Sequence, residues 1–347
     1  MKAIPDRNKF ESNPAYNAWI DAQFTESNSG GLSILGKALR PSEVLHRLGY
    51  DVYESAFQQF KQSREESLID LVTEQFPIII AHPFSRFLEA SENEIQRLQF
   101  LRDTWEGLIN FVHAVIVGEA RNAKLQMLAP ARCSNILSDR LADRISTIES
   151  VLLIARKAQV ILEASKIIDP ATIAVIRVLN QARNAFSHTG APSEGQAKQY
   201  IAECIDEVFD VLEAFTCLKD VRLLRYDRLD GTQLRHERFD GHSRTRRFSS
   251  VHIPPALAAA SVTLLTREET LVLAGGKLLS VKPLLHLIPH PGGHFTQVTF
   301  FKKAKGAPPD RKLVFEIVGE SVEVEEARQP FQPIVNDIRA LFGEPPE

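Results

Sequence analysis

The spacing of apolar residues divides the chain into a helical stretch and a β-rich stretch. Between about residues 67 and 226, apolar side chains recur every three or four positions, which is typical of amphipathic helices. The pattern predicts helices from about Ser91, from about Asp139, from Pro170 to near Gly190, and from about Ser193. A capping box at residues 91–94 is expected to open the first of them. Short connections between such helices favour an antiparallel bundle.

After Tyr226 the period of the apolar pattern shortens, and strands are expected. The predicted strands cover residues 262–265, 270–273, 278–287, 296–301 and 312–318, and a last helix covers about 333–342. Turn signals at 267–269 and 275–276 predict antiparallel neighbours. Residues 226–250 are expected to form a polar approach to these strands.

The first sixty residues are expected to form an extension with short helices of its own. A turn cluster at residues 27–31 precedes a helical pattern from Pro41 to about Phe60, with few large apolar residues for an independent core. We therefore predict an α+β fold in three segments: an extension at 1–60 that acts as a dimer arm, an antiparallel helical bundle at 61–226, and a small β-rich antiparallel C-terminal domain with a terminal helix at 227–347.

Composition narrows the class of protein. The chain has 347 residues, of which 44% are hydrophobic and 24% charged, and this excludes a disordered or fibrous protein. No apolar run approaches the ~18–20 residues of a membrane span, and the N-terminus lacks a signal-peptide core. The three cysteines have no C-x-x-C spacing, which argues against a disulfide framework and a cysteine zinc site. We expect a cytoplasmic protein with no membrane partner.

The formal net charge of −3 hides an uneven distribution. Residues 219–312 carry 17 basic and 8 acidic side chains, a net of +9, whereas the segments on either side are each at −6. Within the basic block, Arg244, Arg246 and Arg247 are the densest part, and Tyr226, Phe239 and Phe248 lie among the charges. Arginines at phosphates and aromatic rings against unpaired bases would make a nucleic-acid surface. A solvated loop is an equal alternative.

The predicted helix from Pro170 has one polar side. On a helical wheel the apolar residues fall on one arc, which is predicted to be buried: Val175, Ile176, Val178, Leu179, Ala182 and Phe186. The opposite stripe holds Arg177, Asn180, Asn184, Ser187 and His188, and Arg183 lies at its margin. A guanidinium, an amide and an imidazole therefore meet at one helix end. Imidazole can move protons near neutral pH, and guanidinium can stabilise charge developing on a phosphate, so the group suits RNA cleavage without a metal.

Residues 179–188, Leu-Asn-Gln-Ala-Arg-Asn-Ala-Phe-Ser-His, resemble the R-x(4–6)-H signature of the HEPN superfamily, in the form with a polar residue after the arginine. The resemblance covers about residues 67–226. It implies a helical bundle that forms a homodimer with the two motifs facing a shared cleft. It also implies a metal-independent endoribonuclease, often a toxin or an antiviral defence effector, in which Arg183 and His188 are catalytic and Asn184 supports them. RNA would be the partner, and a regulatory protein is a further expectation that no residue identifies.

Three alternatives remain at this point, one of which is an antitoxin or regulator whose β-rich domain contacts the product of a neighbouring gene. His188 can be stabilised by the end of its helix while Arg183 pairs with an acid on a neighbouring helix, for which Glu106 is one candidate. Some HEPN domains bind nucleotides or partners without cutting, so a non-catalytic nucleic-acid-binding or partner-binding dimer is the second alternative.

Metal and cofactor sites are not predicted. His286, His290 and His294 recur every fourth residue, but prolines and glycines between them exclude a helix and favour a hairpin. The chain has no phosphate-binding glycine loop, no G-x-S-x-G and no H-E-x-x-H. We therefore expect no cofactor and no metal.

Overall fold

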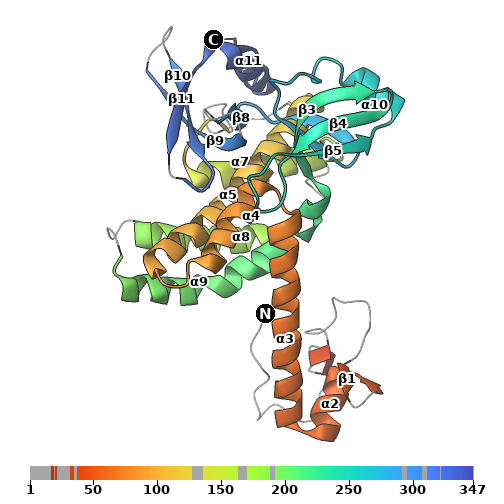
Figure 1. Ribbon diagram of the computed structural model, residues 1–347, viewed down its shortest axis with the longest axis vertical. Helices are drawn as coiled ribbons and strands as arrows, with labels where there is room; N and C mark the ends of the chain where they lie inside the picture. Colours follow the sequence, from red (N-terminus) through yellow and green to blue (C-terminus); the bar gives the residue numbers. More distant parts are fainter. Residues whose placement is uncertain are drawn as a thin grey trace. The chain divides into compact units, whose positions relative to one another are not determined.

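A computed structural model gives the fold of the chain (Figure 1). It describes residues 17–18, 20–21, 32–34, 37–126, 136–162, 170–187, 192–290, 295–306, 311–320 and 322–346, without the side chains of 32–34, 37–39, 170–171 and 182–187. The chain forms two compact units, residues 1–70 and residues 71–347. The long helix α3 (Tyr50–Gln75) contains the division between them.

The first unit has a small apolar core. Strands β1 (Leu32–Ile34) and β2 (Lys37–Leu39) pair antiparallel and lead into helix α2 (Pro41–Leu48). The carboxylate of Asp21 accepts hydrogen bonds from the backbone N–H (2.8 Å) and hydroxyl (2.9 Å) of Ser42 at the start of α2. Buried side chains come from α2, from the first half of α3 and from the segment before them: Ile20, Val44, Leu45, Tyr53 and Phe57. Gly49, with φ of 93°, ends α2, so the single helix predicted over 41–60 is two.

Helix α5 is the centre of the helical part of the second unit. It spans Glu94–Asn122 and packs against α4 (Ile78–Glu89), α7 (Leu141–Lys157) and α9 (Glu194–Ala214), while α8 (Pro170–Ser187) packs against α7 and α9. At Gly107 a β-carbon would lie 2.3 Å from the carbonyl oxygen of Ile79, so the close crossing of α4 and α5 requires glycine there. A short 3₁₀ helix, η3 (Thr216–Asp220), follows α9 and leads to the first long strand.

The start of helix α9 agrees with the sequence prediction, whereas the cap of helix α5 differs from it. Helix α9 begins next to Ser193 as predicted, and Ser193 caps it in a capping box with Gln196. At α5 the prediction of a box opened by Ser91 is wrong, because the cap is Asn93, whose side chain accepts a hydrogen bond of 2.8 Å from the backbone N–H of Gln96. Helix α4 was not predicted, and Pro83 lies inside it.

Two antiparallel sheets make up the C-terminal part. The five-stranded sheet has the order β5-β4-β3-β6-β7, and the four-stranded sheet has the order β11-β10-β9-β8. The strands of the first are β3 (Arg222–Asp230), β4 (Gln233–Arg238), β5 (Arg247–His252), β6 (Leu271–Ala274) and β7 (Lys277–Ser280). Those of the second are β8 (Leu285–Pro289), β9 (Thr296–Lys305), β10 (Lys312–Ile317) and β11 (Glu323–Ala327). The chain is thus a mixed fold with N-terminal and central helices and antiparallel sheets towards the C-terminus.

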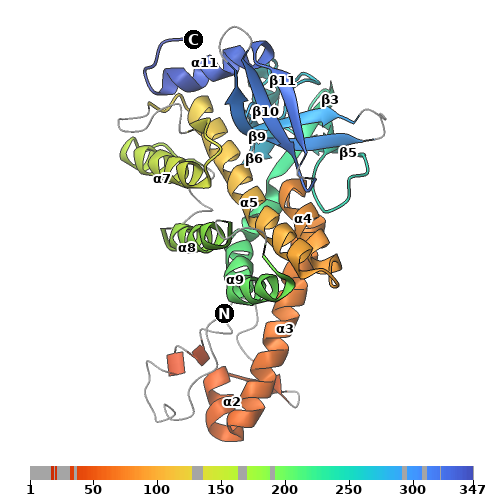
Figure 2. The ribbon, with the colours of Figure 1, turned by 90° about the vertical axis from the view of Figure 1, so that its left-hand side faces the viewer.

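The helices and sheets of the second unit share buried contacts. Helix α5 runs from α4 and α9 up to the sheets and touches β7 and the last helix, α11 (Gln332–Leu341), which follows the 3₁₀ turn η4 (Gln329–Phe331) (Figure 2). The buried Arg144 of α7 donates hydrogen bonds to the Asn110 side chain of α5 and, at 2.6 Å, to the carbonyl oxygen of Phe301 in β9. One guanidinium therefore joins two helices and a strand.

Some predicted strands were wrong for identifiable reasons. Residues 262–265 form turns after the short helix α10 (Pro255–Ala260), because proline and a run of alanines favour helix. Residues 278–287 contribute to two strands in different sheets, with Pro283, which lacks a backbone N–H, between them. The polar segment 226–250 holds most of β3, all of β4 and the start of β5, and their solvent-facing arginines hid the strand pattern.

Within the part of the chain that the structure describes, no helix combines the length and the apolar character needed to cross a bilayer.

Candidate nucleic-acid interface

The predicted catalytic motif lies at the end of α8. Arg183 and Asn184 fall in the final turn of this helix, which ends at Ser187; their side chains and all of His188 lie outside the described residues. Earlier on α8, Ile176 and Leu179 are buried as predicted, but Val178 is 54% exposed and does not belong to the buried arc. The prediction placed Val178 at the edge of that arc, and the neighbouring α7 and α9 do not cover it.

The polar stripe of α8 makes a described contact with α7. The Nε of Arg177 donates a hydrogen bond of 2.9 Å to Glu149, and a second nitrogen of the same guanidinium bonds the other carboxylate oxygen. Glu106, considered above as a partner for Arg183, lies on α5 with its carboxylate 3.6 Å from Arg102. The stripe thus contributes one arginine to the packing of α7 against α8.

The predicted arginine run leads into β5, and the sheet sorts its members onto different faces. Register pairs Phe248 with Glu237 and Ser250 with Arg235, so these side chains share one face of the sheet. Arg247 pairs with Arg238 on the opposite face. That opposite face also carries Leu224, Leu234 and Val251, which pack in the sheet's apolar core. We call the other, polar side the outer face.

Arg246 and Phe248 form the centre of the outer face. Phe248 is 43% exposed, and the guanidinium carbons of Arg246 and Arg235 lie 5.2 and 5.6 Å from its ring centroid. A cation over an aromatic ring is attracted to the ring's π electrons, so each guanidinium is held next to the ring of Phe248. Planar guanidinium groups and an aromatic ring together are what stacks on unpaired nucleic-acid bases.

A buried carboxylate holds one side of the outer face in place. Glu237 is only 2% exposed and receives Arg246 at 3.0 Å, Arg225 and, at 3.3 Å, the hydroxyl of Thr296 in β9. Three donors on one carboxylate compensate for its burial. Arg246 is thus held between Glu237 and the Phe248 ring, and 39% of its side chain remains exposed.

The two other predicted arginines have structural partners. Arg247 donates to the carbonyl oxygen of Asp240 and lies 3.5 Å from its carboxylate, which also binds Arg238. Arg244 pairs with Glu320 and donates a 2.8 Å hydrogen bond to the carbonyl oxygen of Val318. Both arginines therefore hold the connection between β4 and β5 in place.

The same connection is tied to the start of α4. The backbone N–H of Ile78 donates to Phe239, and that of Gly241 donates to Phe76, at 2.9 and 2.8 Å. His82 of α4 contacts the carbonyl oxygen of His242 through Nδ1 at 3.0 Å. Burial and, second, the nearby Arg244 guanidinium lower the pKa of His82, so it is neutral in the neutral pH range.

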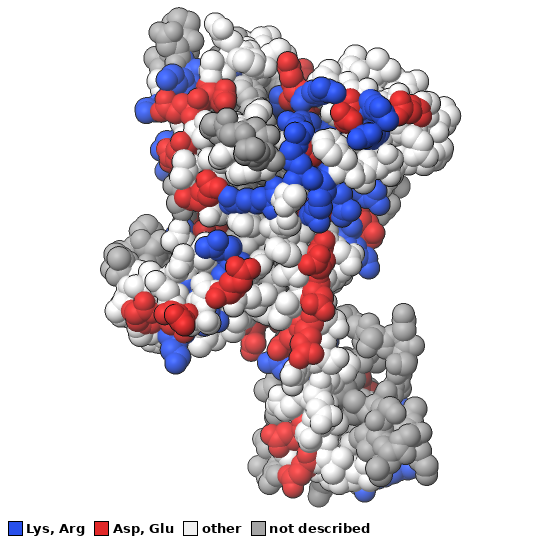
Figure 3. All heavy atoms as spheres, viewed as in Figure 1, with Lys and Arg blue, Asp and Glu red and all other residues white. Residues whose placement is uncertain are grey.

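The outer face and its margins carry more positive than negative charge. Five arginines share three carboxylates there: Arg225 and Arg246 bind Glu237, Arg235 and Arg267 bind Asp227, and Arg228 binds Asp230. Arg228 and Arg235 also lie directly opposite each other in the β3–β4 register, where like charges repel. Lys and Arg side chains accordingly gather around β4, β5 and the connection before β5 (Figure 3). The surplus of two positive charges suits a polyanion.

Sequence reasoning missed two of the residues that matter on this face. Arg235 and Arg228 belong to strands that were not predicted, although residues 246, 248, 250 and 252 alternate with partly buried positions in the way a half-exposed strand does. That alternation is one of burial in the neighbouring strand β5, and the sequence Arg-Arg-Phe-Ser-Ser-Val-His does not show it.

Metal ligands do not cluster in the described residues. No group of three or more His, Cys, Asp or Glu side chains there could hold a metal ion. His286 lies in β8 with its ring 5.3 Å from Phe315 and 5.1 Å from Phe331, and His290 stacks on Phe295 at 4.2 Å. His294 lies outside the described residues. Burial lowers the pKa of His286 to about 4, which fits a neutral core side chain.

Comparison of the chain with protein-family models, with curated proteins and with solved structures gives no match.

Proposed function

We propose that the protein is a metal-independent endoribonuclease of the HEPN type, acting as a toxin or an antiviral defence effector in the cytoplasm. The observation that carries the proposal is the position of Arg183 and Asn184 in the final turn of α8, with His188 following at once, on a helix that packs against α7 and α9. An R-x(4)-H motif at the end of a helix in an antiparallel bundle is what the HEPN resemblance requires.

The chemistry assigns one role to each motif residue. His188 takes the proton of a ribose 2′-hydroxyl or gives one to the leaving 5′-oxygen, because imidazole titrates near neutral pH. Arg183 binds the scissile phosphate and stabilises the charge that develops on it, and Asn184 orients the pair. Attack of the 2′-oxygen on phosphorus breaks the bond to the 5′-oxygen and leaves a 2′,3′-cyclic phosphate. A homodimer would bring two motifs to one cleft.

The outer face would hold the RNA. Its charge surplus binds the backbone, and the stack of Arg235, Phe248 and Arg246 favours unpaired bases. Arg244 and Arg247 contribute to this surface through the connection they hold in place.

The test is cleavage of RNA by the purified protein in EDTA, with His188→Ala and Arg183→Ala as variants and Lys198→Ala, an exposed residue of α9, as the control. Each motif variant is expected to lose at least about a hundredfold in rate, as removal of one acid–base or charge-stabilising group does, and the control to keep the wild-type rate. Cleavage that persists unchanged in both variants would refute the site assignment.

A second function is favoured by the outer face itself, because its cations and its exposed aromatic ring can bind nucleic acid without any catalytic group. On this alternative the protein is a non-catalytic HEPN-like dimer that binds nucleic acid or a protein partner. It predicts tight, salt-sensitive RNA binding by wild-type protein with no cleavage under any condition in which the protein is folded.

A further inference from the structure

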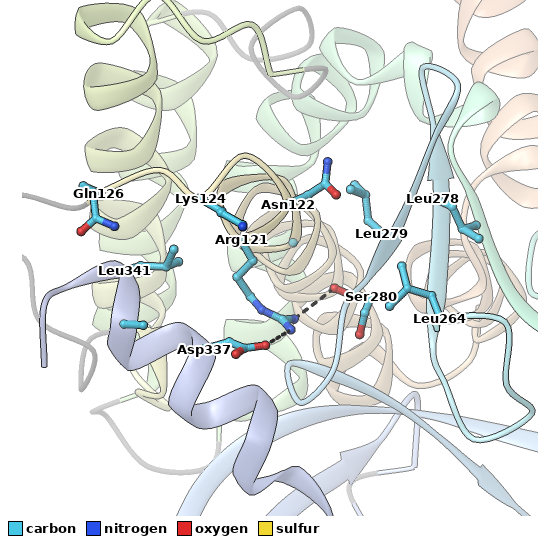
Figure 4. Close-up of a pocket in the computed structure, with 12 residues that line it drawn as sticks. Arg121, Asn122, Lys124, Gln126, Leu264, Leu278, Leu279, Ser280, Asp337 and Leu341 are labelled. Carbon is cyan, nitrogen blue, oxygen red and sulfur yellow. Dashed lines mark hydrogen bonds and ion pairs between the residues drawn. The ribbon is translucent and has the colours of Figure 1, made fainter. Parts of the chain in front are cut away.

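A cavity of about 380 Å³ opens between the end of α5, strand β7 and helix α11. Cavities of this size hold small organic molecules. Its polar lining comes mainly from the last turn of α5 and from Asp337 of α11, and its apolar lining comes from four leucines (Figure 4). The lining therefore offers one charged end and one apolar wall.

Arg121 is the central polar group. Its guanidinium lies between Asp337 and the backbone of Ser280 (Figure 4), with contacts of 3.3 and 3.4 Å. A third contact of 3.3 Å reaches the carbonyl oxygen of Lys282. All three are longer than the usual ~2.9 Å of such hydrogen bonds. Among the described residues, the buried Nε of Arg121 has no hydrogen-bond partner. The Nε is closed off from solvent, but the side chain keeps 14% of its surface exposed, so its terminal nitrogens, whose contacts are long, can bind a further acceptor in the cavity.

The charge of the lining favours an anion. Arg121 and Lys124 are its two cations, and Asp337 is its one carboxylate. Asp337 is 67% exposed, so solvent weakens its hold on Arg121. The partial negative charge of the α5 C-terminus is also reduced, because the carbonyls of Glu119, Ala120 and Arg121 accept hydrogen bonds from the N–H groups of residues 123–125.

The apolar wall of the cavity indicates that the ligand also has a hydrophobic part. The leucines that line the cavity are Leu278 and Leu279 of β7, Leu341 of α11 and Leu264 from the turn after α10. The first three are buried. Apolar surface beside a fixed cation binds a molecule that carries a hydrophobic body next to its charge.

We propose that this cavity is a binding site for a small organic anion. A phosphate or carboxylate group binds Arg121 and Lys124, and an aromatic or aliphatic body packs on Leu278, Leu279 and Leu341. The proposal is independent of RNA cleavage and stands whether or not the R-x(4)-H motif is catalytic. Because the site joins α5 to β7 and α11, the ligand would link the helical and β-rich parts of the second unit.

Isothermal titration of the full chain tests the site with four probes: phenyl phosphate, benzoate, inorganic phosphate and neutral benzyl alcohol, each up to about 10 mM, a range that detects weak binding. We expect phenyl phosphate or benzoate to bind at least about tenfold more tightly than inorganic phosphate, through the apolar body, and benzyl alcohol not to bind. The tighter of the two aromatic anions identifies the charged group.

Two variants assign the binding to this cavity without removing Arg121. Asp337→Asn removes the carboxylate that competes for the guanidinium, so it should tighten anion binding by about threefold, the scale of a solvent-exposed ion pair. Lys124→Gln should weaken it by a similar factor. Glu65→Gln, which removes an exposed, lysine-paired carboxylate from α3, far from both the cavity and the outer face in the sequence, is the control and should change nothing.

Absence of binding by both aromatic anions in the wild type and in Asp337→Asn would overturn the proposal. Binding that neither Asp337→Asn nor Lys124→Gln alters would overturn it as well, since the anion would then lie elsewhere.

Discussion

The arginines of β4, β5 and their connection form two groups that look alike in the sequence. Arg235 and Arg246 lie on the outer face beside the exposed ring of Phe248, whereas Arg238 and Arg247 lie on the opposite face and hold Asp240. The difference arises from the two-residue period of a strand, which sends neighbouring side chains to opposite faces. A dense run of basic residues therefore indicates a polyanion surface only after the strand register is known.

The largest effect that separates the two groups should come from the outer face. The combined variant Arg235→Ala, Arg246→Ala, Phe248→Ala is expected to weaken binding of single-stranded RNA about a hundredfold, because it removes one stacking ring and two cations. Fluorescence anisotropy in a His188→Ala background measures this without cleavage. The control is Lys312→Ala, an exposed and ion-paired cation on β10, which should change affinity less than about threefold. Equal losses in both would show that only total charge matters.

Arg238 and Arg247, the arginines on the opposite face, should affect the stability of the fold and not the binding of RNA. Arg247→Ala removes the hydrogen bond to the Asp240 carbonyl and one of two guanidiniums at its carboxylate, and is expected to lower the free energy of unfolding by about 1.5 kcal/mol. Urea unfolding followed by circular dichroism gives this value. Arg235→Ala should cost less than about 0.5 kcal/mol, since its pair with Asp227 is exposed. The reverse order would contradict the division into two groups.

The salt dependence of RNA binding should give a smaller, independent distinction between the two groups of arginines. The slope of log affinity against log salt should fall by about one for Arg235→Ala, as for loss of one phosphate contact, and should stay the same for Arg247→Ala. If both slopes fall equally, Arg247 also reaches the RNA.

The smallest effect should be on the pH dependence of stability, through His82 and its contact with the connection between β4 and β5. Burial and Arg244 lower the pKa of His82 in the folded protein. When the pH falls below 6.5, the ordinary pKa of histidine, this residue therefore binds fewer protons in the native state than in the unfolded state. Its contribution to stability is therefore present above that pH and is lost as the pH falls. Denaturant midpoints at about pH 7.5 and about pH 5.5 should differ less in His82→Asn than in the wild type. The variant keeps a donor for the His242 carbonyl, and an unchanged difference would rule out His82 as the source.

The helices were the more predictable part of this fold. Ser193 and Pro170 mark helix starts with local chemistry, and α8, α9 and α11 begin within a residue or two of their predicted positions. The β3–β4–β5 strands could not be read in the same way, because Arg225, Arg228 and Arg235 occupy positions where a strand pattern normally shows neutral polar residues.

The candidate surface was predictable in its charge and not in its geometry. The +9 block located it, and Arg246 is where a binding arginine was expected. Register between strands brings Glu237 to Arg246 and Arg235 to Phe248, and register depends on pairing across the sheet and not on neighbouring sequence. Arg121 and its cavity gave no sequence signal at all, since α5, β7 and α11 lie far apart along the chain.

The most direct test of the account is the rate of RNA cleavage in EDTA as a function of RNA concentration, for the wild type, His188→Ala and the outer-face triple variant. We predict that the wild type cuts RNA to 2′,3′-cyclic phosphate ends, that His188→Ala loses kcat while still binding, and that the triple variant raises KM with kcat nearly unchanged. A wild type that binds RNA without cutting it, or a triple variant with the wild-type KM, would contradict the division of labour between α8 and the outer face.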